Sequence, residues 1–95
     1  MFKVYILYSP SIDAYYIGQS EDVSTRFQWH KEKLFGRSFT KRAEDWTIFL
    51  IIDCISRKQS VNIEAHIKRM KSRRYLENLK KYAEIIQKLK LRYPE

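Results

Sequence analysis

The sequence from position 15 to position 20 reads Tyr-Tyr-Ile-Gly-Gln-Ser, a β-prone run that reaches a glycine near its end. A second β-prone run, Lys3 to Tyr8, comes before it. The residues between the two runs, Ser9 to Asp13, include Pro, Ser and Asp, which favour turns. The pattern therefore predicts an antiparallel hairpin.

Two tyrosines and a glycine of this hairpin are candidate functional residues. If the turn centres on Ser11, Tyr5 and Tyr16 are cross-strand neighbours, whereas a register shift of one residue would place one of them on the other face. From the hairpin alone, both side chains are explained by packing on a strand with a polar tip. Gly18 stands where strand should give way to helix. It would allow a positive φ, or the close approach of another backbone or of a phosphate.

The chain has 95 residues and a formal net charge of +8, which bounds its architecture and its partners. This length suits a single modest core, so we expect residues 1–95 to form one domain. The positive charge favours a polyanionic partner, either nucleic acid or an anionic membrane surface. A basic surface alone does not establish an activity.

Cys54 is the only cysteine, so no internal disulfide can form, and this fits a reducing compartment. The longest apolar run, Ile48 to Ile52, is far too short to span a membrane, and no secretory signal follows Met1. We therefore expect an intracellular, cytoplasmic protein with no membrane partner.

Ser20 is a suitable N-cap for a helix that we expect to run to about Leu34. Arg26 and His30 are four residues apart on it and so share one face, although such a pair usually belongs to a solvated surface. The next segment, 35–45, lacks helical periodicity and is expected to form a basic loop. Cations around an aromatic ring suit a nucleic-acid backbone, but an ordinary solvated loop explains them equally. The residues in question are Arg37, Phe39, Thr40, Lys41 and Arg42.

Positions 46–53, Trp-Thr-Ile-Phe-Leu-Ile-Ile-Asp, are apolar on both faces and predict a third strand that is covered on each side. Ser56 and Gln59 then fit a capping box that opens a helix from about Arg57 to Met70.

Glu64 and Lys68 on that helix are spaced for an i,i+4 ion pair, which by itself would be structural. Residues 72–95 are expected to supply a C-terminal packing helix, from Tyr75 to Tyr93, with a clear period of three and four.

In their order along the chain, these motifs resemble the GIY-YIG nuclease superfamily. The shared features are a first-strand tyrosine, a second-strand Tyr-Ile-Gly, a helix with an arginine and a histidine one turn later, and a later helix with a glutamate. The resemblance covers Val4 to about Arg73 and is closest for the small stand-alone members. Val4 stands where the first motif of the family has glycine, a replacement that these small members tolerate. The matching positions are Tyr5, Tyr16, Gly18, Arg26, His30 and Glu64.

The resemblance implies an α/β (α+β) fold with a small three-stranded antiparallel sheet flanked by three or more helices. It also implies an endonuclease that hydrolyses phosphodiester bonds in DNA with a divalent metal, Mg²⁺ or Mn²⁺, held by Glu64. Arg26 would hold the scissile phosphate, and the general base would be Tyr5, Tyr16 or His30. The residues that would contact substrate are Gly18, Arg37, Thr40, Lys41, Arg42 and Lys68.

We expect no appended DNA-recognition domain, so sequence specificity should be weak. Selectivity would then come from substrate shape, as in branched or flapped DNA, or from an accessory protein. One alternative is a non-catalytic nucleic-acid-binding module on the same scaffold, and another is a protein-interaction domain. Every candidate catalytic position is filled, which favours the enzyme. Cleavage of RNA, the oligomeric state and the pathway, whether DNA repair, recombination or a mobile element, stay open.

Overall fold

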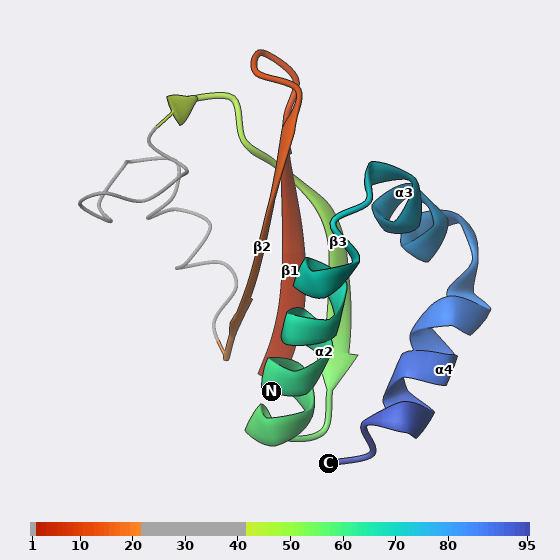
Figure 1. The fold of residues 1–95 in the computed structure, drawn as a ribbon. Coiled ribbons are helices and arrows are strands. Elements are labelled where there is room, and N and C mark those ends of the chain that lie inside the picture. The colour runs from red at the N-terminus through yellow and green to blue at the C-terminus, as the bar shows by residue number, and fades with distance from the viewer. Residues whose placement is uncertain (1, 22–41) are drawn as a thin grey trace.

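The computed structural model describes residues 2–21 and 42–95. These form three strands, β1 (Phe2–Ser9), β2 (Ala14–Ser20) and β3 (Thr47–Cys54), and three helices, α2 (Arg57–Met70), α3 (Arg73–Lys81) and α4 (Ala83–Arg92) (Figure 1). The strands make one antiparallel sheet in the order β2-β1-β3. The predicted α+β class with a small three-stranded sheet flanked by helices is therefore confirmed.

The β1–β2 hairpin forms as predicted, but its register differs from the expected one by two residues. Tyr5 is opposite Gly18, and Leu7 is opposite Tyr16. The strands pair up to Ser9 and Ala14, so the turn is made by Pro10 to Asp13; Asp13 adopts a left-handed conformation with φ 50° and donates its N–H to the Pro10 carbonyl at 3.3 Å. A shift of two residues preserves the face of every side chain. The tyrosines are therefore diagonal neighbours and not a directly opposed pair.

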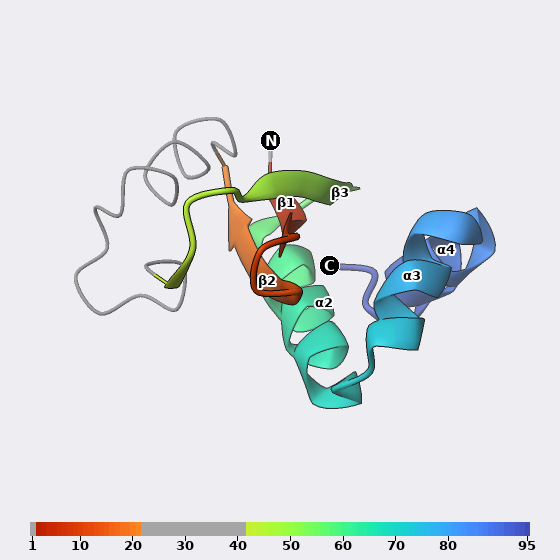
Figure 2. The ribbon, with the colours of Figure 1, turned by 90° about the horizontal axis from the view of Figure 1, so that it is seen from above.

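The sheet has a helix-covered face and an opposite face. The helices α2, α3 and α4 all lie on the first side of the sheet (Figure 2). There, alternate residues of β1 and β3 pack with all three helices in one core. Its buried members are Val4, Ile6, Ile52, Cys54, Ile63, Ile67, Leu76, Leu79 and Leu89. On the opposite face, Tyr5 and Leu7 pack with Ala43 and Trp46 in a smaller cluster. The two candidate tyrosines lie on this second face.

The prediction that the third strand is covered on both sides is wrong. β3 is an edge strand, and it buries only the side chains that point toward the helices. Two of its isoleucines remain substantially exposed, Ile48 by 43% and Ile51 by 39%. Apolar composition on both faces thus did not distinguish a central strand from an edge strand.

The predicted helix from Arg57 to Met70 has these same bounds in α2. Ser56 Oγ accepts the Gln59 N–H at 3.0 Å, as a capping box requires. The Gln59 side chain, however, accepts from the N–H of Ile55 at 2.9 Å instead of returning to Ser56.

The single C-terminal helix predicted from Tyr75 to Tyr93 is wrong, because the chain breaks at Tyr82 into α3 and α4. Tyr82 has an extended backbone, and its N–H closes α3 on the Asn78 carbonyl at 2.7 Å. In a continuous helix, Leu79 and Leu89 would be about 15 Å apart along the axis. The break lets both leucines enter the same core. None of the helices within the described residues is long and apolar enough to cross a lipid bilayer.

Candidate active site

The contact between Tyr5 and Gly18 is the central feature of the hairpin. The Tyr5 ring lies directly over the Gly18 backbone, so that a Cβ placed at Gly18 would come 2.5 Å from the phenol oxygen and 2.6 Å from Cζ. Such distances are far below van der Waals contact. Gly18 is therefore required by the position of the Tyr5 side chain. From the sequence we expected a positive φ, or the approach of a backbone or a phosphate, to explain this glycine; the tyrosine opposite it was not predicted.

Tyr16 lies on the same face as Tyr5, with 6.3 Å between their ring centroids and an interplanar angle of 32°. The two differ in access to solvent, because Tyr5 is 2% exposed whereas Tyr16 is partly exposed. Tyr16 packs on the cluster that contains Trp46 and Ala43. The hairpin thus presents one enclosed phenol and one more open phenol side by side.

Asp45 fixes the segment before β3 to the hairpin turn. Its carboxylate accepts from the backbone N–H and the hydroxyl of Ser11, both at 2.8 Å, and also from the buried hydroxyl of Ser9. The Ser9 hydrogen bond, followed by those from Ser11, holds the pKa of the Asp45 carboxyl below its usual range. These hydrogen bonds hold Trp46 against the face of the sheet that carries Tyr5, and they keep the exposed Arg42 near the hairpin turn. Asp45 was not predicted from the sequence, since a contact across 34 positions leaves no local pattern.

Glu64 lies on the side of α2 that follows β2. One turn before it, Ser60 Oγ approaches the Gln19 side chain of β2 at 3.4 Å, and almost one turn after it, Ile67 packs in the same core as Ile17. Glu64 therefore lies beside β2 on the helix-covered face of the sheet, whereas Tyr5 and Tyr16 lie on the opposite face. Because β2 is an edge strand, groups from both faces can meet only at its open edge.

The predicted pair between Glu64 and Lys68 is present, with 3.3 Å between Lys68 Nζ and Glu64 Oε1. The Lys68 side chain is 53% exposed and the Glu64 side chain 20%. The carboxylate is thus partly enclosed, and its cationic partner remains accessible to a ligand.

Within residues 2–21 and 42–95, no group of three or more His, Cys, Asp or Glu side chains could hold a metal ion. Glu64 would act as a lone carboxylate ligand. This fits a hard divalent cation such as Mg²⁺, which proteins commonly hold through one or two carboxylates while waters and substrate phosphate complete its shell. The donor set does not fit Zn²⁺, which requires several nitrogen or sulfur ligands.

Five of the predicted site residues lie outside the described residues. They are Arg26, His30, Arg37, Thr40 and Lys41. The structure thus brings together Tyr5, Tyr16 and Gly18, places Glu64 beside Lys68, and leaves these five positions as predictions.

Comparison with known proteins identifies one family. The family model described as the GIY-YIG catalytic domain matches residues 1–82. The match runs from β1 to Tyr82, the residue that separates α3 from α4, and so includes all of the described candidate residues. No curated protein and no solved structure gives a significant match to the chain.

Proposed function

The chain belongs to the GIY-YIG family, a family of nucleases, and from that membership we propose that it is a metal-dependent endonuclease that hydrolyses phosphodiester bonds in DNA. The observation that carries the proposal is the close packing of the Tyr5 phenol on Gly18, with Tyr16 beside it. An ordinary strand pair would accept a Cβ at position 18, whereas this one holds a phenol in its place. The hairpin therefore holds the Tyr5 hydroxyl in a fixed position, as the proposed role requires.

Glu64 is the residue that would hold the divalent cation, Mg²⁺ or Mn²⁺. When bound, such an ion supplies Lewis-acid stabilisation of negative charge on a phosphate oxygen. Glu64 is suited to the role because its side chain is only 20% exposed, and partial burial strengthens the interaction of a carboxylate with a cation. Lys68 partly neutralises this carboxylate, and its exposed ammonium group is placed to contact a substrate phosphate.

The tyrosines act on the attacking water. Tyr5 is enclosed and held against Gly18, so its hydroxyl can orient a water molecule, or its phenolate can accept the proton of that water, without having to be immobilised during the reaction. Tyr16 supports it from the same face. A tyrosine with its ordinary pKa near 10 is a poor base at neutral pH, so the role requires nearby positive charge. Arg26 and His30 would supply that charge, and Arg26 would hold the scissile phosphate.

Backbone contacts provide the remaining affinity for DNA. The net charge of +8 favours a polyanion, and Arg42, with the predicted loop residues Arg37, Thr40 and Lys41, would contact the strand. We propose a cytoplasmic enzyme that is selective for DNA shape, such as branched or flapped DNA, more than for sequence.

The test is cleavage of labelled duplex, flapped, branched and single-stranded DNA with Mg²⁺ or Mn²⁺, with binding recorded in the same samples. Wild type should cut, and should lose cutting when EDTA is added. Glu64→Ala and Arg26→Ala should abolish cleavage while binding persists. Glu77→Ala, which removes an exposed glutamate of α3, is the matched control and should cleave normally. A wild type that binds DNA but cuts none of the substrates would refute the proposal in favour of a binding module.

A further inference from the structure

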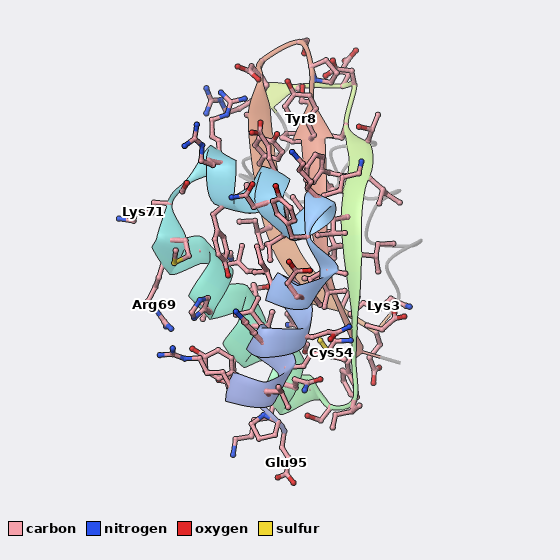
Figure 3. All side chains as sticks on the ribbon, turned by 90° about the vertical axis from the view of Figure 1, so that its right-hand side faces the viewer. Lys3, Tyr8, Cys54, Arg69, Lys71 and Glu95 are labelled. Atoms are coloured by element: carbon pink, nitrogen blue, oxygen red, sulfur yellow. The ribbon has the colours of Figure 1, made fainter. Side chains whose placement is uncertain are left out.

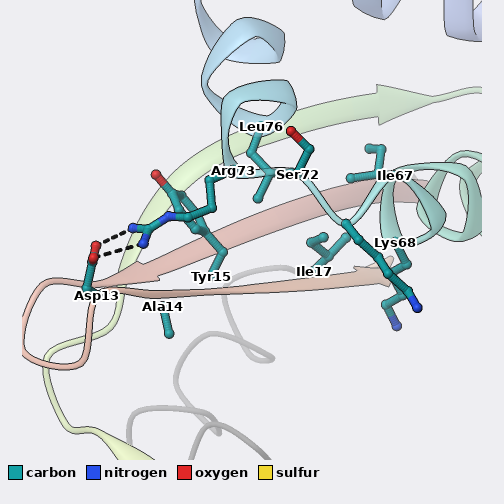
Figure 4. A pocket seen from close by; sticks show the side chains of 10 residues that line it. Asp13, Ala14, Tyr15, Ile17, Ile67, Lys68, Ser72, Arg73 and Leu76 are labelled. Carbon is teal, nitrogen blue, oxygen red and sulfur yellow. Dashed lines mark hydrogen bonds and ion pairs between the residues drawn. The ribbon is translucent and has the colours of Figure 1, made fainter.

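A pocket of about 260 Å³ lies between β2, the C-terminal end of α2 and the start of α3 (Figure 4). Its floor is apolar, formed by Ile17, Ile67 and Leu76, and the side chains of Lys68 and Arg73 stand at its rim. Lys71 also lines it. An apolar floor with cations around it suits a phosphate group together with the sugar that carries it.

Only one of these three cations lacks an anionic partner within the described residues. Arg73 makes two hydrogen bonds to the Asp13 carboxylate, one of them at 2.9 Å, and Lys68 is paired with Glu64 at 3.3 Å. No ion pair of Lys71 is formed among the residues that the structure describes. Lys71 therefore gives the pocket its uncompensated positive charge.

Lys71 also has an unfavourable backbone conformation. It follows the last residue of α2 with φ 47° and ψ 40°, in the left-handed region. Glycine is preferred at this position, and asparagine after it, because a Cβ atom lies too close to the backbone carbonyl in the left-handed region. Figure 3 shows the Lys71 side chain extending away from the end of α2. A cationic residue kept where glycine would suit the fold better points to a use for its side chain.

Lys71 lies just past the end of the helix that carries the candidate metal ligand. Glu64 and Lys68 are one turn apart on α2, and the seven residues from Glu64 to Lys71 span about 10 Å along the helix axis. Successive phosphates of one DNA strand are about 3.4 Å apart along the duplex axis. With the duplex axis parallel to α2, a phosphate about two to three nucleotides from the one at Glu64 would therefore reach Lys71.

We propose that Lys71 and this pocket bind a backbone phosphate of the DNA strand about two to three nucleotides from the scissile phosphate. The location relative to the cut rests on the proposed nuclease function, whereas phosphate binding by the pocket does not. The pocket would fix the direction in which the strand crosses the site.

The experiment measures DNA binding without metal, so that no cleavage interferes, as a function of salt concentration. For Lys71→Gln, the slope of log K against log salt should fall in magnitude by about one unit. Lys88→Gln, which removes an exposed lysine of α4, should keep the wild-type slope. Lys71→Gly provides a second variant, because it should raise the melting temperature by a few degrees while weakening DNA binding as much as Lys71→Gln does. A rise in stability together with a loss of binding cannot come from misfolding.

Equal slopes for Lys71→Gln and wild type would overturn the proposal, as would equal losses for the Lys71 and Lys88 variants. If Lys71→Gln lost binding of inorganic phosphate but kept that of DNA, the pocket would serve a free anion and the assignment to a strand would be wrong. If the slopes behave as expected but wild type never cleaves, the pocket stands and the nuclease proposal fails.

Discussion

Replacing Gly18 by alanine tests the core of the site, because it inserts a methyl group where the Tyr5 phenol lies. The new Cβ would be 2.5 Å from the phenol oxygen, so the ring or the β2 backbone must move by about 1 Å to reach ordinary contact. The ring cannot simply swing into solvent, since Tyr5 is 2% exposed. Overpacking of this kind costs about 1–3 kcal/mol, and the lower backbone entropy of alanine offsets about 0.5–1 kcal/mol of it. We expect a net loss of about 1–2 kcal/mol in the free energy of unfolding.

The effect on cleavage should exceed the effect on stability. A displacement of about 1 Å at a catalytic group can cost about 100-fold in rate, so Gly18→Ala should lower kcat by about that factor while the protein remains folded. Urea unfolding and single-turnover cleavage measure the two quantities. In a Tyr5→Leu background the clash is absent, so Gly18→Ala should no longer destabilise the protein. If it costs the same free energy in both backgrounds, our explanation of Gly18 is refuted.

Three further predictions concern stability. Hydrogen bonds from Arg73, then from Tyr8, lower the pKa of Asp13 to about 2; the stability from this contact should be complete above about pH 4 and disappear as the pH falls toward 2. When the free energy of unfolding is measured against pH, wild type should therefore lose stability over this range, whereas Asp13→Asn should not show this loss. Burial, then repulsion by nearby arginines, lowers the pKa of His66. The stability that depends on the neutral imidazole should therefore be complete above about pH 6.5 and lost as the pH falls through the lowered pKa. His66→Gln should remove this pH dependence of the free energy of unfolding. Leu79→Ala empties a fully buried position and should cost about 2–5 kcal/mol in urea unfolding, whereas Leu91→Ala, at 80% exposure, should cost almost nothing.

Local signals in the sequence predicted the parts of the fold that depend on local chemistry. The Ser56 cap and the apolar period after it gave the bounds of α2, and the turn residues gave the hairpin. The register was wrong because it depends on the left-handed conformation of Asp13, which asparagine and aspartate adopt only in some turns. The break at Tyr82 has no glycine or proline to mark it and follows from the core that α3 and α4 share.

The candidate site was predictable to the extent that it is carried by a family pattern. Tyr5, Tyr16, Gly18 and Glu64 were identified in this way, but nothing in the sequence indicated that the tyrosines and the glutamate approach from opposite faces of the sheet. For the proposed function, that arrangement makes the position of β2 at the sheet edge essential. A strand added outside β2 would separate the two halves of the proposed site.

The helix beyond the family match supports the site indirectly. α4 lies outside residues 1–82, yet its Leu89 is 5% exposed within the core that packs on α2. Past α4, the Tyr93 carbonyl accepts from the Gln59 side chain at 2.9 Å, and the Tyr93 hydroxyl lies 3.0 Å from His66 Nδ1. Gln59 and His66 stand on either side of Glu64 along α2, so these contacts hold the helix that carries the carboxylate from the side away from β2. The C-terminal segment therefore helps to fix the position of α2, and with it of Glu64, relative to the sheet.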